Sequence, residues 1–523
     1  MTDKRISRRS FVKAASLAAA ASALAACTPA TTAPKATSVP VEPTATTAAV
    51  EAAATAAPVD PTATAAPTQL PKVDLIWNVV SGGEPQDLAT VEAAVNDYLA
   101  PRINATVKFV HADWGSYGDK INLVHNSGEQ NDIEFTAPWT NNYGAGVTNG
   151  VFVDLSEALP QYAPDLYASM APTTWNAAKI GGKIYGVINQ QRFPKLMGIS
   201  VRKDLAEKYG LDLEAIKNYS DQALFDFMQK VKDGGDVKYV SVAPWVDPTP
   251  FMYDTLGVAV VKVDDASGKA VNFYDTPEFA EYMHNIRKWA EAGFLPVDPI
   301  PDEDAAVKAG EVGMLVLRNS VGPGADINLK NKFGMEFLTK QMHEAFLNTD
   351  GCVATLNAVS VASKNPERAL MLLNLVNTDP VLYNLICYGV EDKQWKWVDK
   401  DKKLIEKIAD SGYDPNTNWE FGNTFNAYYA DPALVGMADL DREVNEKAKP
   451  SPVLGFAFDR KPVETILAGM GAVVDPLNAL LYAGLEADVD AAIANIKAAA
   501  SAAGQDEVLA EVNKQIENWK KGM

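Results

Sequence analysis

The composition of the first 71 of the 523 residues indicates that this part of the chain does not belong to a folded domain. Residues 28–71 consist almost entirely of Ala, Thr, Pro and Val, with no aromatic residue and no regular apolar period. Such a segment cannot bury enough apolar surface to offset the entropy lost on ordering. We therefore expect a disordered tether over residues 27–71. The folded part would be residues 72–523, which is long enough for two sizeable lobes.

The residues before the tether are typical of an exported lipoprotein. A basic region with Arg8 and Arg9 precedes an apolar run, Ala14–Ala26, and Cys27 follows directly. A bilayer takes roughly 20 apolar residues, so this run is too short for a transmembrane anchor. We interpret residues 1–26 as a twin-arginine signal peptide ending in a lipobox. Cys27 would then carry the lipid, such as palmitate, on the outer face of the cytoplasmic membrane, which is extracellular or periplasmic.

The net charge narrows the class of partner. The whole chain carries −20, and removal of residues 1–26 brings this to about −24. An acidic surface disfavours nucleic acid and an anionic membrane face as partners. It fits an exported protein with a neutral or cationic ligand.

Cysteine usage leaves one structural question open. After Cys27, only Cys352 and Cys387 remain. An oxidising exported compartment would permit a disulfide between them. The alternative, which we prefer, is two buried thiols.

The folded part begins with alternating strand and helix patterns. Residues 72–80 are β-rich, and Asp87 can cap a helix whose apolar residues follow a period of 3.6, namely Leu88, Val91, Val95 and Leu99. Residues 106–110 and 131–136 have the pattern of two further strands. This alternation predicts an α/β fold with a parallel sheet covered by helices.

Helix patterns recur to the end of the chain. We expect helices after Thr276 and Asn365, each with proline at the first position, and a short helix closed by Gly210. The last helix should bury a stripe spaced 3, 4, 3, namely Leu509, Val512, Ile516 and Trp519. That stripe is too short for a coiled coil, so it predicts core packing.

Short segments in a fixed order give the sequence a family resemblance. It resembles the extracellular solute-binding lipoproteins of ABC importers, family 1, in the sugar-binding class, and more narrowly the LplA-type subgroup. The matching segments are 113–117, 132–136, 139–143, 182–185, 202–205, 365–369, 419–423 and 451–456. The resemblance covers essentially all of the folded part, and it rests on the order and number of the segments.

The resemblance implies a two-lobed, periplasmic-binding-protein-like fold of type II, with a ligand cleft between the lobes and hinge strands. By analogy the first lobe comprises residues 72–188 plus 353–390, and the second comprises 189–352 plus 391–523 with the subgroup-specific C-terminal region. The chain would cross between the lobes near residues 185–189 and 348–354.

The resemblance also implies a function. The protein would capture an extracellular sugar or oligosaccharide by hinge closure and deliver it to the permease subunits of an ABC importer. We expect a monomer without nucleic acid, cofactor, metal or catalytic residues, bound to the membrane only through the lipid at Cys27.

A sugar offers hydroxyl groups for hydrogen bonds and flat C–H faces for stacking, so its site needs Trp or Tyr beside polar side chains. Loops with this mixture at strand ends, at the first crossing and in the second lobe supply our candidates. They are Glu84, Trp139, Asn142, Tyr143, Gln190, Arg192, Trp245, Trp419 and Asn423.

Several candidates also have a purely structural reading. Trp139 or Tyr143 could pack a helix start, with Asn142 as a turn residue. Trp419 could cover the late helices, and Arg192 could be an ordinary surface arginine. Asp87, near Glu84, is better explained as a helix cap.

Motifs for metal or covalent chemistry are missing from the sequence. The four histidines have no metal-ligand spacing, and no metalloprotease, nucleophile-elbow or P-loop motif occurs. The acidic residues 302–304 most simply favour a helix N-terminus, with a calcium loop as the alternative.

Two other classes stay open from sequence. A secreted glycan-cleaving hydrolase needs only two carboxylates about 5 to 10 Å apart. An adhesive or structural surface protein would bind no small ligand saturably. Turnover of an oligosaccharide would identify the hydrolase.

Overall fold

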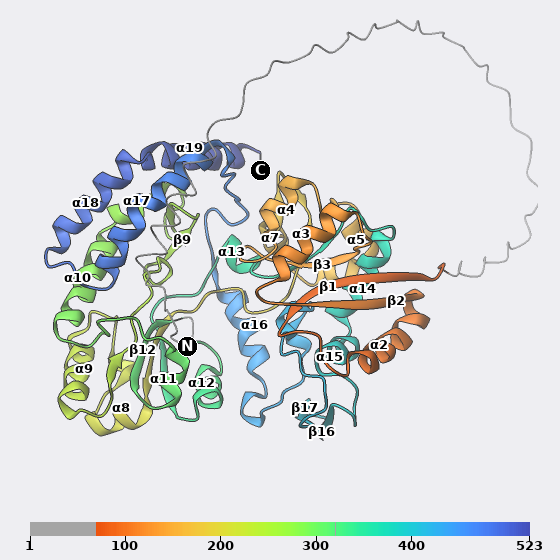
Figure 1. Cartoon of the computed structure of the whole chain (residues 1–523), viewed down its shortest axis with the longest axis horizontal. Coiled ribbons are helices and arrows are strands. Elements are labelled where there is room, and N and C mark those ends of the chain that lie inside the picture. Colours follow the sequence, from red (N-terminus) through yellow and green to blue (C-terminus); the bar gives the residue numbers. More distant parts are fainter. Residues whose placement is uncertain (1–69, 319–320, 523) are drawn as a thin grey trace, which may run out of the picture. The chain divides into compact units, whose positions relative to one another are not determined.

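The computed structural model describes residues 70–318 and 321–522 (Figure 1). The predicted signal peptide, Cys27 and almost all of the predicted tether lie outside the described residues. Within the described part, two α/β lobes each have their own sheet and hydrophobic core.

The first lobe is built on a five-stranded sheet in the order β2-β1-β3-β15-β6. Its strands are β1 (Val73–Ser81), β2 (Ala105–Asp113), β3 (Ile133–Thr136), β6 (Gly186–Ile188) and β15 (Leu356–Val359). The predicted parallel alternation is confirmed, because β1 runs parallel to both β2 and β3. The returning strand β15 is antiparallel to β3 and to β6.

Helices cover this sheet. The first, α2 (Leu88–Ile103), buries the four apolar residues that the sequence predicted. Asp87 precedes α2, but its carboxylate accepts hydrogen bonds from the side chains of Thr90 (2.5 Å) and Gln394 (2.6 Å) instead of capping the helix backbone. The other helices are α3 (Tyr117–Ser127), α4 (Tyr143–Asn149), α5 (Ala158–Tyr162), α6 (Pro164–Ala168), α7 (Pro172–Ala177), α14 (Pro366–Thr378) and α15 (Pro380–Tyr388). A hairpin of β4 (Lys179–Ile180) and β5 (Lys183–Ile184) precedes β6.

The second lobe has a four-stranded sheet in the order β13-β7-β12-β8 and a three-stranded sheet in the order β11-β10-β9. The strands are β7 (Gly198–Arg202), β8 (Tyr239–Ser241), β9 (Tyr253–Thr255), β10 (Val260–Lys262), β11 (Ala270–Val271), β12 (Val312–Arg318) and β13 (Phe337–Gln341). The helices are α8 (Lys203–Tyr209), α9 (Gln222–Gly234), α10 (Pro277–Glu291), α11 (Glu303–Lys308), α12 (Ala325–Phe333), α17 (Glu464–Tyr482), α18 (Val489–Ala502) and α19 (Gln505–Lys521). The predicted stripe of α19 faces this core, with Val512 and Ile516 fully buried.

The longest of these helices, α17, belongs to the second-lobe core. By length and composition alone, residues 461–482 could cross a membrane, and only a small part of their apolar stretch is buried. However, Leu467, Met470, Val474 and Leu481 on one side of α17 pack into the core with α10, α18 and α19. We therefore assign α17 to the second lobe.

Within residues 70–318 and 321–522, three segments connect the lobes. The first, residues 189–197, joins β6 to β7, so the crossing lies later in the chain than the predicted 185–189. The second contains β14 (Phe346–Leu347) and α13 (Thr349–Cys352), close to the predicted position. The third contains α16 (Met437–Lys447), which Figure 1 shows between the lobes, and β18 (Lys449–Pro450). Strands β14 and β18 pair in parallel, so the second and third crossings are hydrogen-bonded to each other.

The segment after residue 390 differs from the expected division. It was assigned to the second lobe, but Tyr413 and Phe421 are buried in the first-lobe core. The hairpin of β16 (Trp395–Asp399) and β17 (Leu404–Lys407) precedes them. This segment therefore returns to the second lobe only after α16, because its aromatic residues complete the core around α15 and β1.

Both cysteines of the folded part are free and buried, which answers the disulfide question in favour of two thiols. Burial raises the pKa of the Cys352 thiol to about 12 and also raises that of Cys387.

Candidate functional site

Three tryptophans meet beside the carboxyl end of the first-lobe sheet. Trp114 follows β2, Trp139 follows β3, and Trp419 lies in a short 3₁₀ turn, η4 (Asn418–Glu420). The ring centroid of Trp114 is 6.5 Å from that of Trp139 and 5.9 Å from that of Trp419, and Trp139 and Trp419 are 6.0 Å apart. Trp114 is 48% exposed and Trp139 is 55% exposed. We call these three residues the tryptophan triad.

Trp139 is fixed by the strand before it and by the second crossing. Its indole Nε1 donates a hydrogen bond to the carbonyl oxygen of Ala354 (2.9 Å). Its ring lies against buried Phe135 of β3, with the centroids 5.7 Å apart. The turn after it holds Asn141 at a φ of +41°, where its side-chain amide donates to the buried carboxylate of Glu134 (2.9 Å). The ring therefore stands exposed next to a lobe-connecting segment.

Trp114 stands on a tight turn at the end of β2. The Asp113 carboxylate accepts hydrogen bonds from the Gly115 backbone N–H (3.1 Å) and from the Ser116 hydroxyl. These bonds lower the pKa of Asp113 and keep its carboxylate ionised. The turn starts at Asp113, which pairs with Ser81 of β1, and it holds the Trp114 ring stacked against that of Trp419.

Trp419 is attached to the sheet through its neighbour Glu420, which is fully buried. One Glu420 carboxyl oxygen, Oε1, accepts from the Val80 N–H at the end of β1 (2.6 Å). The Glu420 carbonyl accepts from the side chains of Asn189 (2.9 Å) and Asn357 (2.8 Å). Asn189 begins the first crossing, and Asn357 lies on β15 just after the second crossing. The segment that carries Trp419 is thus hydrogen-bonded to the start of the first crossing and to β15.

The environment of Glu420 favours its neutral form. Burial raises the pKa of this carboxyl well above its usual range, outweighing the opposing hydrogen bond from Val80. Its other oxygen, Oε2, is buried near the Thr417 side chain, which together with Val80 only partly offsets the effect of burial. A protonated carboxyl is the form that such a site stabilises.

The glycine after Phe421 lies close to a neighbouring side chain. Gly422 has a φ of +103°, and an added Cβ would lie 3.0 Å from the side chain of Asn377. Only glycine fits this backbone without strain. Trp419, three residues earlier, packs against a cluster of buried residues that includes Val80 and Phe135.

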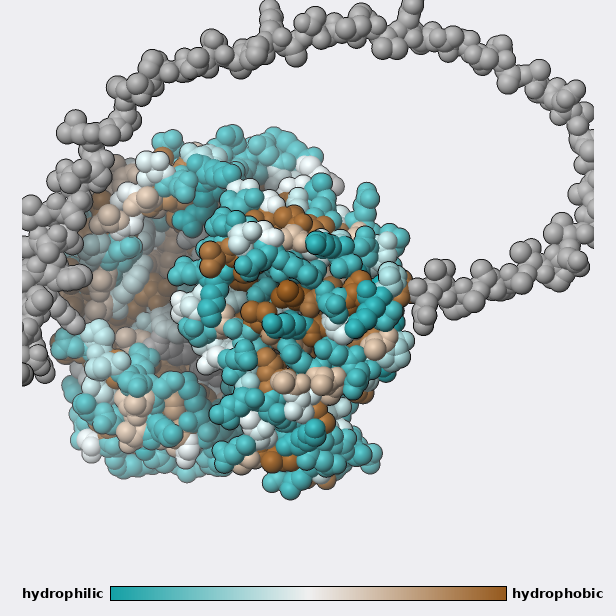
Figure 2. Space-filling view, turned by 45° about the vertical axis from the view of Figure 1, so that its right-hand side comes forward, coloured by the Kyte–Doolittle hydropathy of each residue, from teal (hydrophilic) through white to brown (hydrophobic). Residues whose placement is uncertain are grey.

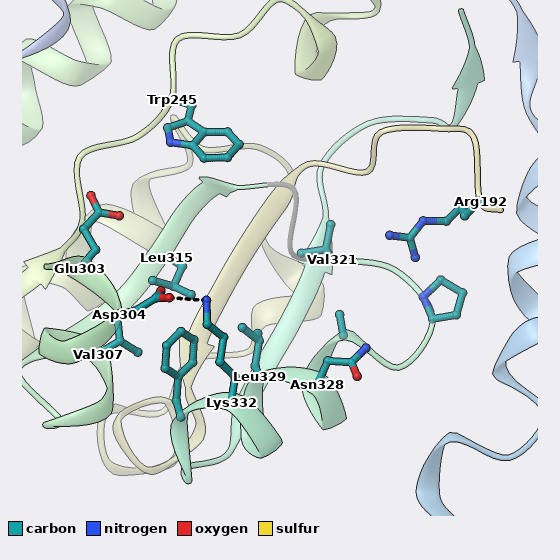
Figure 3. Close-up of a pocket in the computed structure, with 13 residues that line it drawn as sticks. Arg192, Trp245, Glu303, Asp304, Val307, Leu315, Val321, Asn328, Leu329 and Lys332 are labelled. Carbon is teal, nitrogen blue, oxygen red and sulfur yellow. Dashed lines mark ion pairs between the residues drawn. The ribbon is translucent and has the colours of Figure 1, made fainter. Parts of the chain in front are cut away.

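The second lobe contributes a cavity of about 400 Å³, called here the first cavity (Figure 3). Trp245, 46% exposed, and Arg192 of the first crossing lie at its rim. Apolar side chains form part of its wall, and polar ones include Glu303, Asn328 and an ion pair between Asp304 and Lys332 (2.6 Å). Its lining residues are Arg192, Trp245, Glu303, Asp304, Val307, Leu315, Val321, Pro323, Ala325, Asn328, Leu329, Lys332 and Phe333.

The structure brings some predicted site residues together. Trp139 and Trp419 are in ring contact, and Trp245 and Arg192 share the first cavity. Arg192 is not an ordinary surface arginine, because its Nη1 lies 3.0 Å from Oδ1 of Asp441 on α16.

Two residues of the Trp139 loop have structural roles instead. Tyr143 is 4% exposed, and its hydroxyl donates to the Ala178 carbonyl oxygen (2.6 Å), so its ring belongs to the core. Asn142 caps α4 by accepting from the Ala145 N–H (2.9 Å). The structural reading of this loop therefore applies to these two residues, while Trp139 itself is exposed.

Gln190 and Asn423 also support the fold. The Gln190 side chain is buried and donates to the Ser169 hydroxyl (2.9 Å). Asn423 accepts from the Phe425 N–H (3.1 Å) and donates to the Asn377 carbonyl oxygen (3.2 Å). Their backbones form an isolated bridge that joins the first crossing to the η4 region. Glu84, by contrast, is exposed after the turn that ends β1.

Sequence reasoning missed Trp114 as a site residue. It was noted only within a segment that carries the family resemblance. The available signal was its position, since Trp114 follows β2 as Trp139 follows β3, and parallel strands end at the same edge of a sheet.

The acidic residues 302–304 form a helix start, as the simpler reading predicted. Asp302 caps α11 by accepting from the Ala305 N–H (2.9 Å). Among the described residues, no group of three or more His, Cys, Asp or Glu side chains is arranged to hold a metal ion.

Two α/β lobes joined by three crossings, with exposed aromatic rings at one sheet edge and a cavity in the other lobe, define a two-lobed ligand-binding protein. A family model described as bacterial extracellular solute-binding protein matches residues 93–386, more than half of the chain. The chain belongs to this family. A domain of unknown function matches residues 452–521, which contain the three helices that complete the second-lobe core.

Known relatives agree in sequence and fold. A carbohydrate ABC transporter substrate-binding protein of Streptococcus pneumoniae is 26% identical over 450 residues, covering 84% of this chain and 90% of that protein. The crystal structure of the N-glycan transport solute binding protein NgtS from the same species has a TM-score of 0.76 at 23% identity, covering 86% and 99% of the two chains.

NgtS is also known in complex with two sugars. The complex with Man1GlcNAc has a TM-score of 0.66 at 23% identity, covering 86% of this chain and 100% of that one. The complex with Man5GlcNAc has a TM-score of 0.63 at 24% identity, covering 86% and 99%. These likenesses establish the two-lobed solute-binding fold for this chain.

Proposed function

We propose that this protein is the substrate-binding component of an ABC-type importer and that its ligand is a carbohydrate. The observation that supports the proposal most directly is the tryptophan triad. The rings of Trp114 and Trp139 are exposed at the carboxyl edge of the first-lobe sheet, where open α/β sheets bind ligands, and the ring of Trp419 is partly buried beside them. Aromatic faces of this kind can stack against the C–H face of a sugar ring.

The polar half of the site would come from the second lobe. The first cavity combines Trp245 with charged and amide side chains, which can meet sugar hydroxyls. Trp139 is bonded to the second crossing, and Arg192 belongs to the first. Rotation of the lobes about these crossings would bring the cavity towards the triad, so closure and ligand binding would be coupled.

The remaining elements of the proposal concern location and partners. An extracellular or periplasmic site agrees with the family, and the lipid at Cys27 would keep the protein near its permease. A monomer is also proposed, and the face in Figure 2, with the first lobe forward, is mostly hydrophilic with hydrophobic patches near its middle.

Binding without turnover is the expected result of a ligand screen. Mono- and oligosaccharides are added to the purified protein while intrinsic fluorescence, melting temperature and product formation are followed. A true ligand at 100 times its Kd should stabilise the protein by about 2.7 kcal/mol. Saturable binding with an unchanged sugar supports the proposal, whereas cleaved product would identify a hydrolase. A protein that responds to none of the sugars would contradict a carbohydrate ligand.

Membrane attachment should depend on one side chain. The wild-type protein is expected in the detergent-rich phase after phase separation, and Cys27→Ala in the aqueous phase, because the variant has no thiol to acylate. Cys387→Ala is the matched control and should partition like the wild type. Equal partitioning of wild type and Cys27→Ala would exclude a lipid anchor at this position.

A further inference from the structure

A larger cavity of about 620 Å³, called here the second cavity, adjoins the first. Pro323 and Asn328 of the second lobe line both cavities. The opposite wall of the second cavity comes from the first lobe and from α16. An occupant of the second cavity would therefore touch both lobes, as a ligand that favours closure must do.

One ion pair lies between the two cavities. Arg192 lines the first, Asp441 lines the second, and the two side chains are bonded at 3.0 Å. Each of the two side chains is 25% exposed. A ligand that extends from one cavity to the other would pass this pair, which offers donors on one side and acceptors on the other.

The second cavity is lined by aromatic and amide side chains. Tyr428 and Tyr429 present partly exposed rings, and Asn416 and Asn418 lie near them. At the second-lobe side, Asn331 donates to the Asp431 carboxylate (2.7 Å) and so links α12 to the segment before α16. Rings beside amides are the chemistry that suits a sugar, and the volume lies within the usual range of small-molecule sites, about 300–1,000 Å³.

We propose that the second cavity is an extension subsite for the distal units of an oligosaccharide. This rests on the proposed function, and it adds that the ligand is longer than a disaccharide. The first units would occupy the region of the triad and the first cavity, and the following units would continue past Arg192 and Asp441 onto Tyr429. Affinity should then increase with chain length, because only a longer ligand gains the contacts of the second cavity.

The test compares a short and a long ligand on a variant of the second cavity. Calorimetry measures the affinity of the wild type and of Tyr429→Ala for short and long sugars. The sugars are Man1GlcNAc and Man5GlcNAc, and di- and pentasaccharides of the manno, malto and xylo series. Tyr209→Ala is the matched control, since Tyr209 has a similar intermediate exposure but lines neither cavity. Melting temperatures without ligand show that each variant is folded, and Asn416→Ala, an exposed position, provides a second variant.

The wild type is expected to bind the longer sugar more tightly than the shorter one. In Tyr429→Ala, the affinity for the longer sugar should fall at least fivefold, while the affinity for the shorter sugar stays unchanged. A Tyr429→Ala variant that binds the longer sugar normally, or that loses the short and long sugars equally, would overturn the extension subsite. Equal affinity of the wild type for both lengths would also overturn it and leave the proposed function standing. No binding of any short or long sugar would contradict the proposed function itself.

Discussion

Trp139→Ala should weaken carbohydrate binding by about thirtyfold or more while the protein remains folded. Truncation of a central interface tryptophan typically costs at least about 2 kcal/mol, and each 1.4 kcal/mol is a factor of ten in affinity. The Trp139 ring is 55% exposed, so its removal creates no core cavity. The melting temperature of the ligand-free protein should therefore change by only a few degrees.

The measurement is calorimetry with the tightest sugar from the ligand screen. Trp519→Ala is the matched control, because Trp519 packs on Phe456 in the second lobe, far from the triad in the fold. Trp114→Ala should show a loss similar to that of Trp139→Ala. The double variant should lose less than the sum of the two, because the rings are in contact. Affinity within twofold of the wild type for both single variants would remove the triad from the site.

The first-lobe sheet could be predicted because its signals are local. Strand and helix periods alternate along residues 72–136, and each buried position of α2 is apolar. The continued packing of residues 391–426 in the first lobe could not be predicted in this way. It depends on where Tyr413 and Phe421 find space, and this is decided by packing against α15 and β1 rather than by the segment's own pattern.

In the candidate site, too, some features could be predicted from local sequence signals and others depend on packing. Exposed tryptophans after strands could be found from sequence, because parallel strands place their carboxyl ends at one edge. The sequence could not separate Trp139 from Tyr143, four residues later, since both are aromatic residues in one polar loop. Their roles differ because α4 begins at Tyr143 and turns this ring into the core, where its hydroxyl meets the Ala178 carbonyl oxygen.

Glu420 connects the triad to the stability of the first lobe, and Glu420→Ala should be costly. The change leaves the Val80 N–H without its acceptor, and an unpaired buried donor costs about 1–3 kcal/mol. The Glu420 carbonyl would keep its bonds to Asn189 and Asn357, since these involve the backbone. Because Trp419 is the adjacent residue, ligand affinity should fall together with stability.

Glu420→Gln should restore both properties, because an amide oxygen can still accept from Val80 and the amide is neutral. If the buried side chain positions Trp419, Glu420→Gln should keep the stability and ligand affinity of the wild type, and Glu420→Ala should lose both. Gln515→Ala, on a partly exposed turn of α19, serves as a control for loss of a hydrogen-bonded polar side chain. Loss of affinity in Glu420→Gln to the level of Glu420→Ala would contradict this role.

The raised pKa of Glu420 makes a second, pH-dependent prediction. In the unfolded chain a glutamate ionises near pH 4.3, whereas the buried carboxyl keeps its proton to a higher pH. The unfolded state then binds fewer protons than the native state, so this group's contribution to stability is full below pH 4.3 and is lost as the pH rises towards the folded-state pKa. The loss amounts to about 1.4 kcal/mol per pH unit in that window.

Comparison with Glu420→Gln isolates this contribution from the many other carboxylates. In urea unfolding from pH 4.5 to 8, the free energy of unfolding of Glu420→Gln should rise relative to that of the wild type as the pH increases. The titratable groups that face Glu420 are Tyr117, Cys387 and Tyr413. Burial raises the pKa of all three, so they stay neutral and the difference reports Glu420 alone. Parallel stability curves for the two proteins would mean that the carboxyl ionises in the folded state as readily as in the unfolded one.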